Sequence, residues 1–268
     1  SLWSSHFAIR PAKLFDGVEQ RLTILIGCHG PSDGNWYTSK YHQWFSEERS
    51  ELFSKIILVS MPPRLSEESP WPKIGSVTEA RILEKRRIFE GSPTHLLLTD
   101  SSKWVMYFHR TPGYWIRMLD FLPFFESPAG DRSVHHIREL YATSEAARAE
   151  IAGLGSSSLY FWWFFAIGNC RNLTKGDLLG FPAPRLDAGG AVEIVRIFNE
   201  LMKSYKDNSS VKSRAKARYQ EFDWVAAKPS VDAMDEFFAK VFGLTDEELD
   251  FVINYDIKVR VGDVAEGI

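Results

Sequence analysis

Most of the information about the fold lies in a stretch near the middle of the chain, which reads Trp104-Val105-Met106-Tyr107-Phe108-His109-Arg110-Thr111-Pro112-Gly113-Tyr114-Trp115-Ile116-Arg117. Apolar and aromatic residues lie on both sides of a Pro-Gly break, which is typical of strands joined by a turn. One interpretation is a buried hairpin whose aromatic side chains belong to the core. The other is a nucleic-acid reader, because arginines bind phosphates and guanine edges while aromatic faces stack on bases.

The segments around this stretch alternate between strand and helix patterns. Strands are expected at 21–27, with 7–10 as its partner, at 56–60, and at 95–99 and 103–109 as a directly bonded pair. Helices are expected at 40–53, 79–90, 143–152, 156–168, 191–205 and 231–242, and Thr174 opens a short helical turn. Thr245 and Glu248 match a capping box that opens a last helix. The sequence therefore predicts an α+β fold, a small mixed sheet with flanking helices followed by a mainly helical C-terminal region.

Composition allows a large core but gives a mixed signal on charge. The chain has 268 residues, of which 44% are hydrophobic, enough for one large domain or two smaller ones. The net charge of −3 weakly opposes a free-standing nucleic-acid binder, which is usually basic. The charge is uneven, however: residues 203–218 hold six basic residues against Asp207, and residues 232–250 hold seven acids against Lys240. The net charge of −3 is therefore compatible with a basic face on part of the surface.

Cysteine content and hydropathy indicate the cytoplasm. Cys28 and Cys170 lie far apart in sequence, which is no disulfide framework and favours a reducing compartment. The longest apolar run, residues 159–167, is shorter than the roughly 20 residues that span a bilayer, so no membrane partner is expected. The chain opens with Ser1-Leu2-Trp3, without an initiator Met, and reads as the middle of a domain. We expect a fragment of a longer protein.

Motifs of complete enzymes are missing from the sequence. It contains no glycine-rich dinucleotide motif, no P-loop and no G-x-S-x-G elbow. Cys28-His29 and His135-His136 lack the spacing of metal ligands, so no metal site is expected. No catalytic residue is assigned. A weaker hypothesis is a hydrolase with His109 or His135 as its base.

Four stretches in order carry a family resemblance. They are 7–24, from Phe7-Ala8-Ile9-Arg10-Pro11 to Arg21-Leu22-Thr23-Ile24; 109–117, His109-Arg110-Thr111-Pro112-Gly113-Tyr114-Trp115-Ile116-Arg117; 160–182, from Tyr160-Phe161-Trp162-Trp163 through Asn169-Cys170-Arg171-Asn172-Leu173-Thr174-Lys175 to Phe181-Pro182; and 244–258, Leu244-Thr245-Asp246-Glu247-Glu248 to Tyr255-Asp256-Ile257-Lys258. Together they resemble the C-terminal half of large bacterial N6-adenine DNA methyltransferases. That group includes the fused type IIG restriction–modification enzymes and phage-exclusion methylases.

The resemblance implies a division of the chain and its partners. Residues 1–30 would be the last strand pair of the methyltransferase catalytic fold, 31–185 the target recognition domain, and 186–268 a helical C-terminal region. The motifs that bind S-adenosylmethionine and grip the adenine would lie upstream. This fragment would therefore hold no cofactor and transfer no methyl group by itself. Its partners would be double-stranded DNA and the upstream catalytic domain of the same protein.

The resemblance also implies roles for particular residues. DNA contact is expected of Arg110, Tyr114, Arg117, Asn169, Arg171 and Lys175. The alternatives are a buried ion pair with core aromatics for the first three and helix capping for the last three. Phe15, with Phe7 as second choice, would stack on the flipped target base, or would instead be a buried hairpin staple. Lys85, Arg86 and Arg87 form either a phosphate patch or a solvated helix face, and Trp162 and Trp163 are expected in the core.

Two points stay open at the level of sequence. The basic residues at 211–218 fit either contacts with DNA phosphates or an exposed, disordered linker. The whole chain also fits a protein-interaction or scaffold module with an aromatic-rich surface. Salt dependence separates that module from a DNA-binding protein, because phosphate contacts weaken steeply as salt rises.

Overall fold

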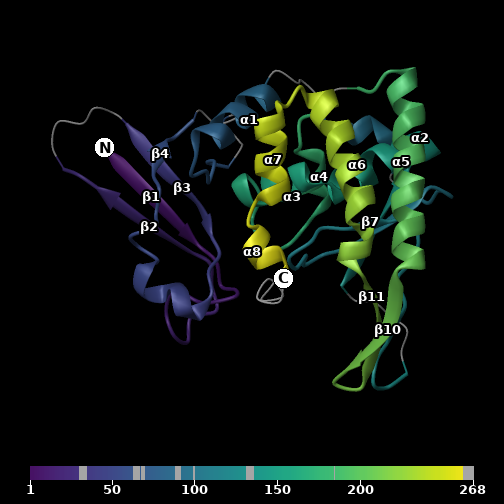
Figure 1. Ribbon diagram of the computed structural model, residues 1–268, viewed down its shortest axis with the longest axis horizontal. Coiled ribbons are helices and arrows are strands. Elements are labelled where there is room, and N and C mark those ends of the chain that lie inside the picture. The colour runs from purple at the N-terminus through teal and green to yellow at the C-terminus, as the bar shows by residue number, and fades with distance from the viewer. Residues whose placement is uncertain are drawn as a thin grey trace. The chain divides into compact units, whose positions relative to one another are not determined.

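The computed structural model describes residues 1–29, 35–62, 67, 70–87, 92–98, 100–130, 136–183 and 185–261. The chain divides into two compact units, each of which combines segments from separate parts of the sequence. Unit 1 is assigned Ser1–Ile88, Trp162–Asn169 and Asn254–Ile268, and unit 2 is assigned Phe89–Phe161 and Cys170–Ile253. Both contain helices and small sheets (Figure 1), which confirms the predicted α+β fold class. The predicted functional boundaries at residues 30 and 185 stay predictions.

Unit 1 is built on a four-stranded mixed sheet with the order β2-β1-β3-β4. Its strands are β1 (Leu2–Phe7), β2 (Leu22–Gly27), β3 (Trp36–His42) and β4 (Val59–Ser60). The predicted strand at 21–27 is confirmed. Its antiparallel partner β1 ends at Phe7, where the predicted partner begins. β3 lies on the other side of β1 and runs parallel to it.

The predicted helix at 40–53 is wrong. β3 continues to His42, and a 3-10 helix η1 (Ser46–Glu51) follows. Tyr41 and Trp44, whose spacing suggested a helix, are both buried, but they are buried from a strand and the turn after it. Pairing with β1 satisfies the backbone of β3 and buries the side chains of its Thr38 and Ser39, so tertiary context overrides local spacing.

Helices from distant parts of the sequence complete unit 1. They are α1 (Val77–Arg87), the C-terminal part of α3 (Ser158–Ala166), and α8 (Ile257–Val261). The indole N–H of Trp162 donates to the buried carboxylate of Glu79 at 3.0 Å. The Lys40 ammonium pairs with Asp256 at 2.6 Å. Trp162 and Trp163 are buried, as predicted.

Unit 2 contains a second four-stranded sheet, with the order β5-β9-β6-β7. Its strands are β5 (Leu97–Leu98), β6 (Val105–His109), β7 (Met118–Leu119) and β9 (Ile137–Ala142), and a 3-10 helix η2 (Pro93–Leu96) precedes β5. The predicted direct pairing of β5 with β6 is wrong, because β9 lies between them. β6 forms a five-residue antiparallel ladder with β9, from Val105 opposite Tyr141 to His109 opposite Ile137. This ladder is long enough to compete with a tight hairpin between β5 and β6.

Five capped helices carry most of the core of unit 2. They are α2 (Glu145–Ser156), α4 (Lys175–Leu179), α5 (Ala188–Asp207), α6 (Trp224–Phe242) and α7 (Asp246–Asn254). Asp187 and Asp223 accept backbone N–H groups at the starts of α5 and α6, and α6 ends at Gly243 in the left-handed conformation. The predicted capping box of α7 is confirmed: the Thr245 amide donates to Glu248 at 2.8 Å, and the Glu248 amide donates to the Thr245 hydroxyl at 3.3 Å.

A β-hairpin interrupts the helices of the C-terminal region. Strands β10 (Ser209–Arg214) and β11 (Ala217–Phe222) pair antiparallel, and β8 (Phe125–Glu126) adds to β11. The basic residues at 211–218 therefore belong to a hairpin, and the alternative of a disordered linker is wrong. Phe222 holds the base of the hairpin, with its ring 5.4 Å from that of Tyr205 and 6.1 Å from that of Phe121.

Candidate nucleic-acid interface

The stretch from Trp104 to Arg117 divides into a buried part and an exposed part. β6 and β7 pair antiparallel with Phe108 opposite Met118, and both of these side chains are buried together with Met106. The strands therefore match the interpretation as a core hairpin. The connection between them is different, because Arg110 is exposed and Tyr114 is 41% exposed. The core-hairpin interpretation thus holds for the strands, and for the exposed connection the nucleic-acid interpretation stays a prediction.

Backbone bonds on both sides hold Arg110 in place. Its amide donates to the His136 carbonyl at 2.7 Å, and its carbonyl accepts from the Leu173 amide at 2.6 Å. The neighbouring Thr111 hydroxyl donates to the Asn172 side-chain oxygen at 3.2 Å. The loop 109–117 and the part of the second motif from Cys170 to Lys175 therefore lie side by side in unit 2. In the described part of the chain, no acid pairs with the Arg110 guanidinium.

Arg171 and Lys175 are exposed beside this loop. The alternative role for them was helix capping, but Thr174 and Asp177 cap α4. The Asp177 amide donates to the Thr174 hydroxyl at 3.2 Å, and the Thr174 amide donates to the Asp177 carboxylate at 2.9 Å. The predicted helical turn at Thr174 is confirmed. The side chain of Lys175, the first residue of α4, is consequently not needed as a cap.

Asn169 is placed differently from the other predicted contacts. It is exposed, and it is the last residue of the segment Trp162–Asn169 assigned to unit 1, whereas the chain from Cys170 onward belongs to unit 2. Arg110, Tyr114, Arg117, Arg171 and Lys175 all belong to unit 2. The role of Asn169 stays a prediction.

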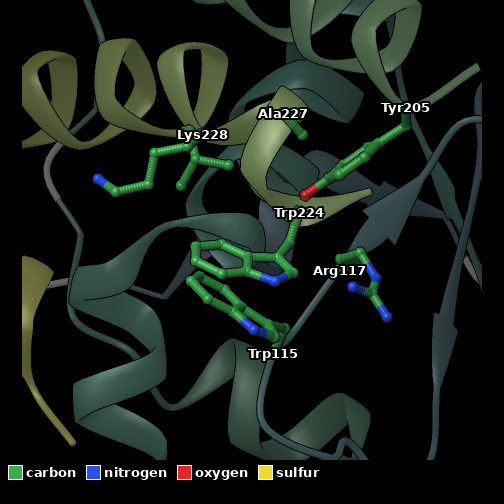
Figure 2. A pocket seen from close by; sticks show the side chains of 7 residues that line it. Trp115, Arg117, Tyr205, Trp224, Ala227 and Lys228 are labelled. Carbon is green, nitrogen blue, oxygen red and sulfur yellow. The ribbon is translucent and has the colours of Figure 1, made fainter. Parts of the chain in front are cut away.

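Arg117 packs partly against an aromatic crevice. Its guanidinium carbon lies 5.5 Å from the centre of the Phe222 ring, a cation–π contact rather than the ion pair that was the alternative. Figure 2 shows Arg117 beside the stacked rings of Trp115 and Trp224, whose centres are 5.5 Å apart. The crevice has a volume of about 10 Å³, the size of one water molecule. Side chains fill this crevice, so it has no room for a substrate.

The positive charge of this surface comes from its arginines and lysines. Desolvation, followed by the charges of Arg117 and His136, lowers the pKa of His109, so its ring is neutral near pH 7. Within the described residues no hydrogen bond or ion pair orients the His109 ring, as a catalytic base requires. His135, the other base of the hydrolase hypothesis, lies outside the described residues.

The other residues singled out in the sequence differ in how well their burial agrees with their predicted roles. Phe15, in the connection between β1 and β2, is 53% exposed, which does not fit a buried staple, whereas Phe7 is fully buried. Arg86 does not lie on a solvated face, because its side chain is completely buried in α1 and burial lowers its pKa to about 8. Lys85 is half-buried, and the side chain of Arg87 lies outside the described part.

The sequence did not predict that one group of cations lies on a β-hairpin. Lys212, Arg214 and Lys216 are exposed on the β10–β11 hairpin. Their charge was visible in the sequence, but the turn residues Ala215 and Lys216 lack the Asn-Gly signal of a hairpin.

Neither a metal centre nor a membrane span is found. In the described residues no group of three or more His, Cys, Asp or Glu side chains is placed to hold a metal ion. No helix there is both long and apolar enough to cross a bilayer. No family model, curated protein or solved structure matches this chain.

Proposed function

We propose that this chain is the DNA sequence-recognition part of an adenine-specific (N6) DNA methyltransferase of the restriction–modification type, and that it binds double-stranded DNA through unit 2. Arg110, Tyr114, Arg171 and Lys175 form the central contact surface, with Arg117 at its edge. Arginines at such a surface bind guanine edges or phosphates, and an exposed tyrosine supplies a flat apolar face or a hydroxyl.

The observation that supports this proposal most is the backbone contact between Arg110 and Leu173. It joins two stretches of the family resemblance that are about sixty residues apart in sequence. A cation used for recognition must be held in position, because a side chain that is free to move loses more entropy on binding. The backbone of Arg110 is bonded on both sides, while the residue is exposed and its guanidinium has no acidic partner among the described residues.

The proposal assigns methyl transfer to a catalytic part upstream in the parent protein. That part would bind S-adenosylmethionine, and the exocyclic nitrogen of the flipped adenine would take its methyl group, with S-adenosylhomocysteine as the leaving group and loss of one proton from the nitrogen. The exposed ring of Phe15 in unit 1 is available to stack on the flipped base, which offsets part of the cost of unstacking. The chain alone is expected to bind DNA and to transfer no methyl group.

A second candidate is a protein-interaction module, and one observation favours it. Unit 1 exposes Leu25 and Ile26 on β2, an edge strand, at 62% and 60%. Trp36 and Trp71, whose rings are 4.6 Å apart, are also partly exposed. Apolar groups along an open strand edge are typical of surfaces that bind another protein. In the leading proposal the same edge would meet the upstream catalytic domain.

The two candidates differ in their response to salt. We would measure binding to a random-sequence duplex by fluorescence anisotropy between about 50 and 200 mM salt, where phosphate contacts weaken strongly. The DNA-recognition proposal expects log K to fall linearly with log salt, with a slope of about −0.9 for each phosphate contacted. Absence of binding at the lowest salt, for a chain shown to be folded by circular dichroism, would reject DNA recognition by this chain and favour the protein-interaction module.

A further inference from the structure

The β10–β11 ribbon is a hairpin that extends from the end of α5; β8 pairs with Arg218 and Tyr219 of β11, so β10 forms its open edge. Six cross-strand pairs run from Ser209 opposite Phe222 to Arg214 opposite Ala217. Its tip is the two-residue turn Ala215-Lys216. Figure 1 shows the ribbon reaching away from α5 and α6, the two helices that it connects.

The outer part of the ribbon carries three cations that form no ion pair among the described residues, and Glu221 lies on the same face as Lys212, toward the base. The three cations are Lys212, Arg214 and Lys216, and all of them are exposed. Two other cations of this region are paired: Arg218, opposite Ser213, with Glu126 at 3.0 Å, and Lys206, in α5, with Asp120 at 3.1 Å. The unpaired cations are thus those of the turn and of the ribbon face that does not hold Arg218.

The ribbon has one packed face and one open face. Residues directly opposite each other in antiparallel strands lie on the same face, so Lys212 shares a face with Tyr219, and Arg214 with Ala217. The other face holds Phe222 and Arg218, which contact Phe121 and Phe124 of unit 2. The face with Lys212, Arg214 and Tyr219 is therefore turned away from these contacts.

The turn places a cation where hairpins usually have glycine. Ala215 and Lys216 have φ angles of 48° and 67°, the left-handed conformation that a two-residue turn of this type requires at both positions. Asn-Gly is the common choice, because side chains with a Cβ are strained there. Strained non-glycine residues are found preferentially at functional sites. Here the strained position carries an exposed ammonium group.

We infer that the β10–β11 ribbon is a second DNA contact, in which Lys212, Arg214 and Lys216 bind backbone phosphates beside the surface around Arg110. This inference rests on the proposed DNA-binding function. Lys212 and Arg214 are two residues apart on one strand, about 7 Å. Phosphates follow each other about every 3.4 Å along the axis of one DNA strand, so the two cations reach different phosphates. The Phe222 ring, in contact with Arg117, connects the base of the ribbon to the first surface.

The test compares two triple variants with the same loss of charge. The ribbon variant combines Lys212→Thr, Arg214→Thr and Lys216→Gly, which keeps strand-forming residues in β10 and gives the turn its preferred glycine. The control combines Arg196→Ala, Lys203→Ala and Lys228→Ala, since each of these cations already pairs with an acid one helical turn away. Both are measured against the native chain on a random duplex, from about 50 to 200 mM salt.

The ribbon variant is expected to reduce the salt slope by about 2 to 3, uniformly across DNA sequences, while the control keeps the native slope. Lys216→Gly alone should reduce it by about 1 and serves as a variant that keeps the hairpin folded. Equal slopes for the ribbon variant and the control, with Arg110→Ala still weakening binding, would overturn this inference and leave the proposed function standing. Failure of the native chain to bind DNA would overturn both. Loss of binding to polyglutamate with unchanged DNA binding would assign the ribbon to an acidic protein instead.

Discussion

Unit 2 contains two antiparallel hairpins that display cations in opposite ways. In β6–β7 the connection is exposed, whereas the strands bury the side chains of Met106, Phe108 and Met118. Arg110 therefore follows a strand that is fixed in the core. In β10–β11 the strands themselves are exposed, and the ribbon is anchored at its base by Phe222. The first arrangement suits contacts that must be placed accurately, such as base edges. The second suits contacts that tolerate movement, such as phosphates.

The largest expected effect is a difference between the two hairpins in how much a truncated side chain lowers the free energy of unfolding. Phe108→Ala in β6 should lower the free energy of unfolding of unit 2 by about 3 to 5 kcal/mol, because it leaves a cavity in the core. Val211→Ala in β10 should change it by about 0.5 kcal/mol or less, because that side chain is 50% exposed. Chemical denaturation followed by tryptophan fluorescence measures both. Similar losses for the two variants would contradict the buried foundation of β6.

The next effect concerns DNA affinity. Arg110→Ala should weaken binding to the preferred sequence by about 1 to 3 kcal/mol if the guanidinium binds a base edge. Lys103→Ala is the matched control, since Lys103 is an exposed cation just before β6, at the strand end opposite Arg110, and lies 4.7 Å over the Trp104 ring. Anisotropy titrations at one salt concentration give both values. A larger loss for Lys103→Ala would place the DNA on the other end of the sheet.

The third effect lies in the turn of β10–β11. Ala215→Asn with Lys216→Gly should stabilise the hairpin by about 1 kcal/mol, because the strained turn is replaced by the preferred pair. Amide hydrogen exchange of residues 209–222 should become slower. Faster exchange in this segment would show that Ala215 and Lys216 do not occupy the left-handed conformation in solution.

A smaller effect tests the loop of β6–β7. Gly113 does not have a positive φ, and an added Cβ would meet no atom within 4 Å. Gly113→Ala should therefore be tolerated and stabilise the native state by about 0.4 to 1 kcal/mol, since it restricts the unfolded chain. Thermal unfolding measures the change. A clear destabilisation would mean that this loop needs the freedom of glycine.

The smallest effect concerns His109, at the end of β6. Its pKa lies below the usual value, so the folded chain keeps the ring neutral where an ordinary histidine begins to take up a proton, and acidification from pH 7.5 to 6.5 adds little charge there. The native chain and His109→Ala should therefore bind DNA with nearly equal affinity at every pH from 7.5 to 6.5. A ratio of the two affinities that grows as the pH falls would show that His109 becomes charged and contacts DNA.

The sequence predicted the elements better than their pairing. Strand and helix patterns located β2, β6, α2, α5 and the capping box of α7, because these signals depend on neighbouring residues. It did not predict that β9 separates β5 from β6, or that β3 pairs with β1 and replaces a helix, because strand pairing is decided by contacts distant in sequence.

The candidate site was predicted in part for the same reason. The cations Arg110, Arg171 and Lys175 were named from motifs, and their exposure agrees with a surface role. The contact that joins them, from the Leu173 amide to the Arg110 carbonyl, has no sequence signal. Arg86 was placed wrongly because its place in a run of charged residues suggests solvent, whereas helix α1 buries it completely. The ribbon was missed because Ala215-Lys216 is an unusual turn.

Hydrogen exchange of the native chain with and without a DNA duplex is the direct test of DNA recognition through unit 2, because it locates the bound surface. DNA should slow exchange in residues 109–117, in residues 171–175 and in the β10–β11 ribbon, and leave the exposed edge strand β2 of unit 1 unchanged. Saturated DNA binding with no change in these three segments, or with protection confined to β2, would contradict recognition through unit 2.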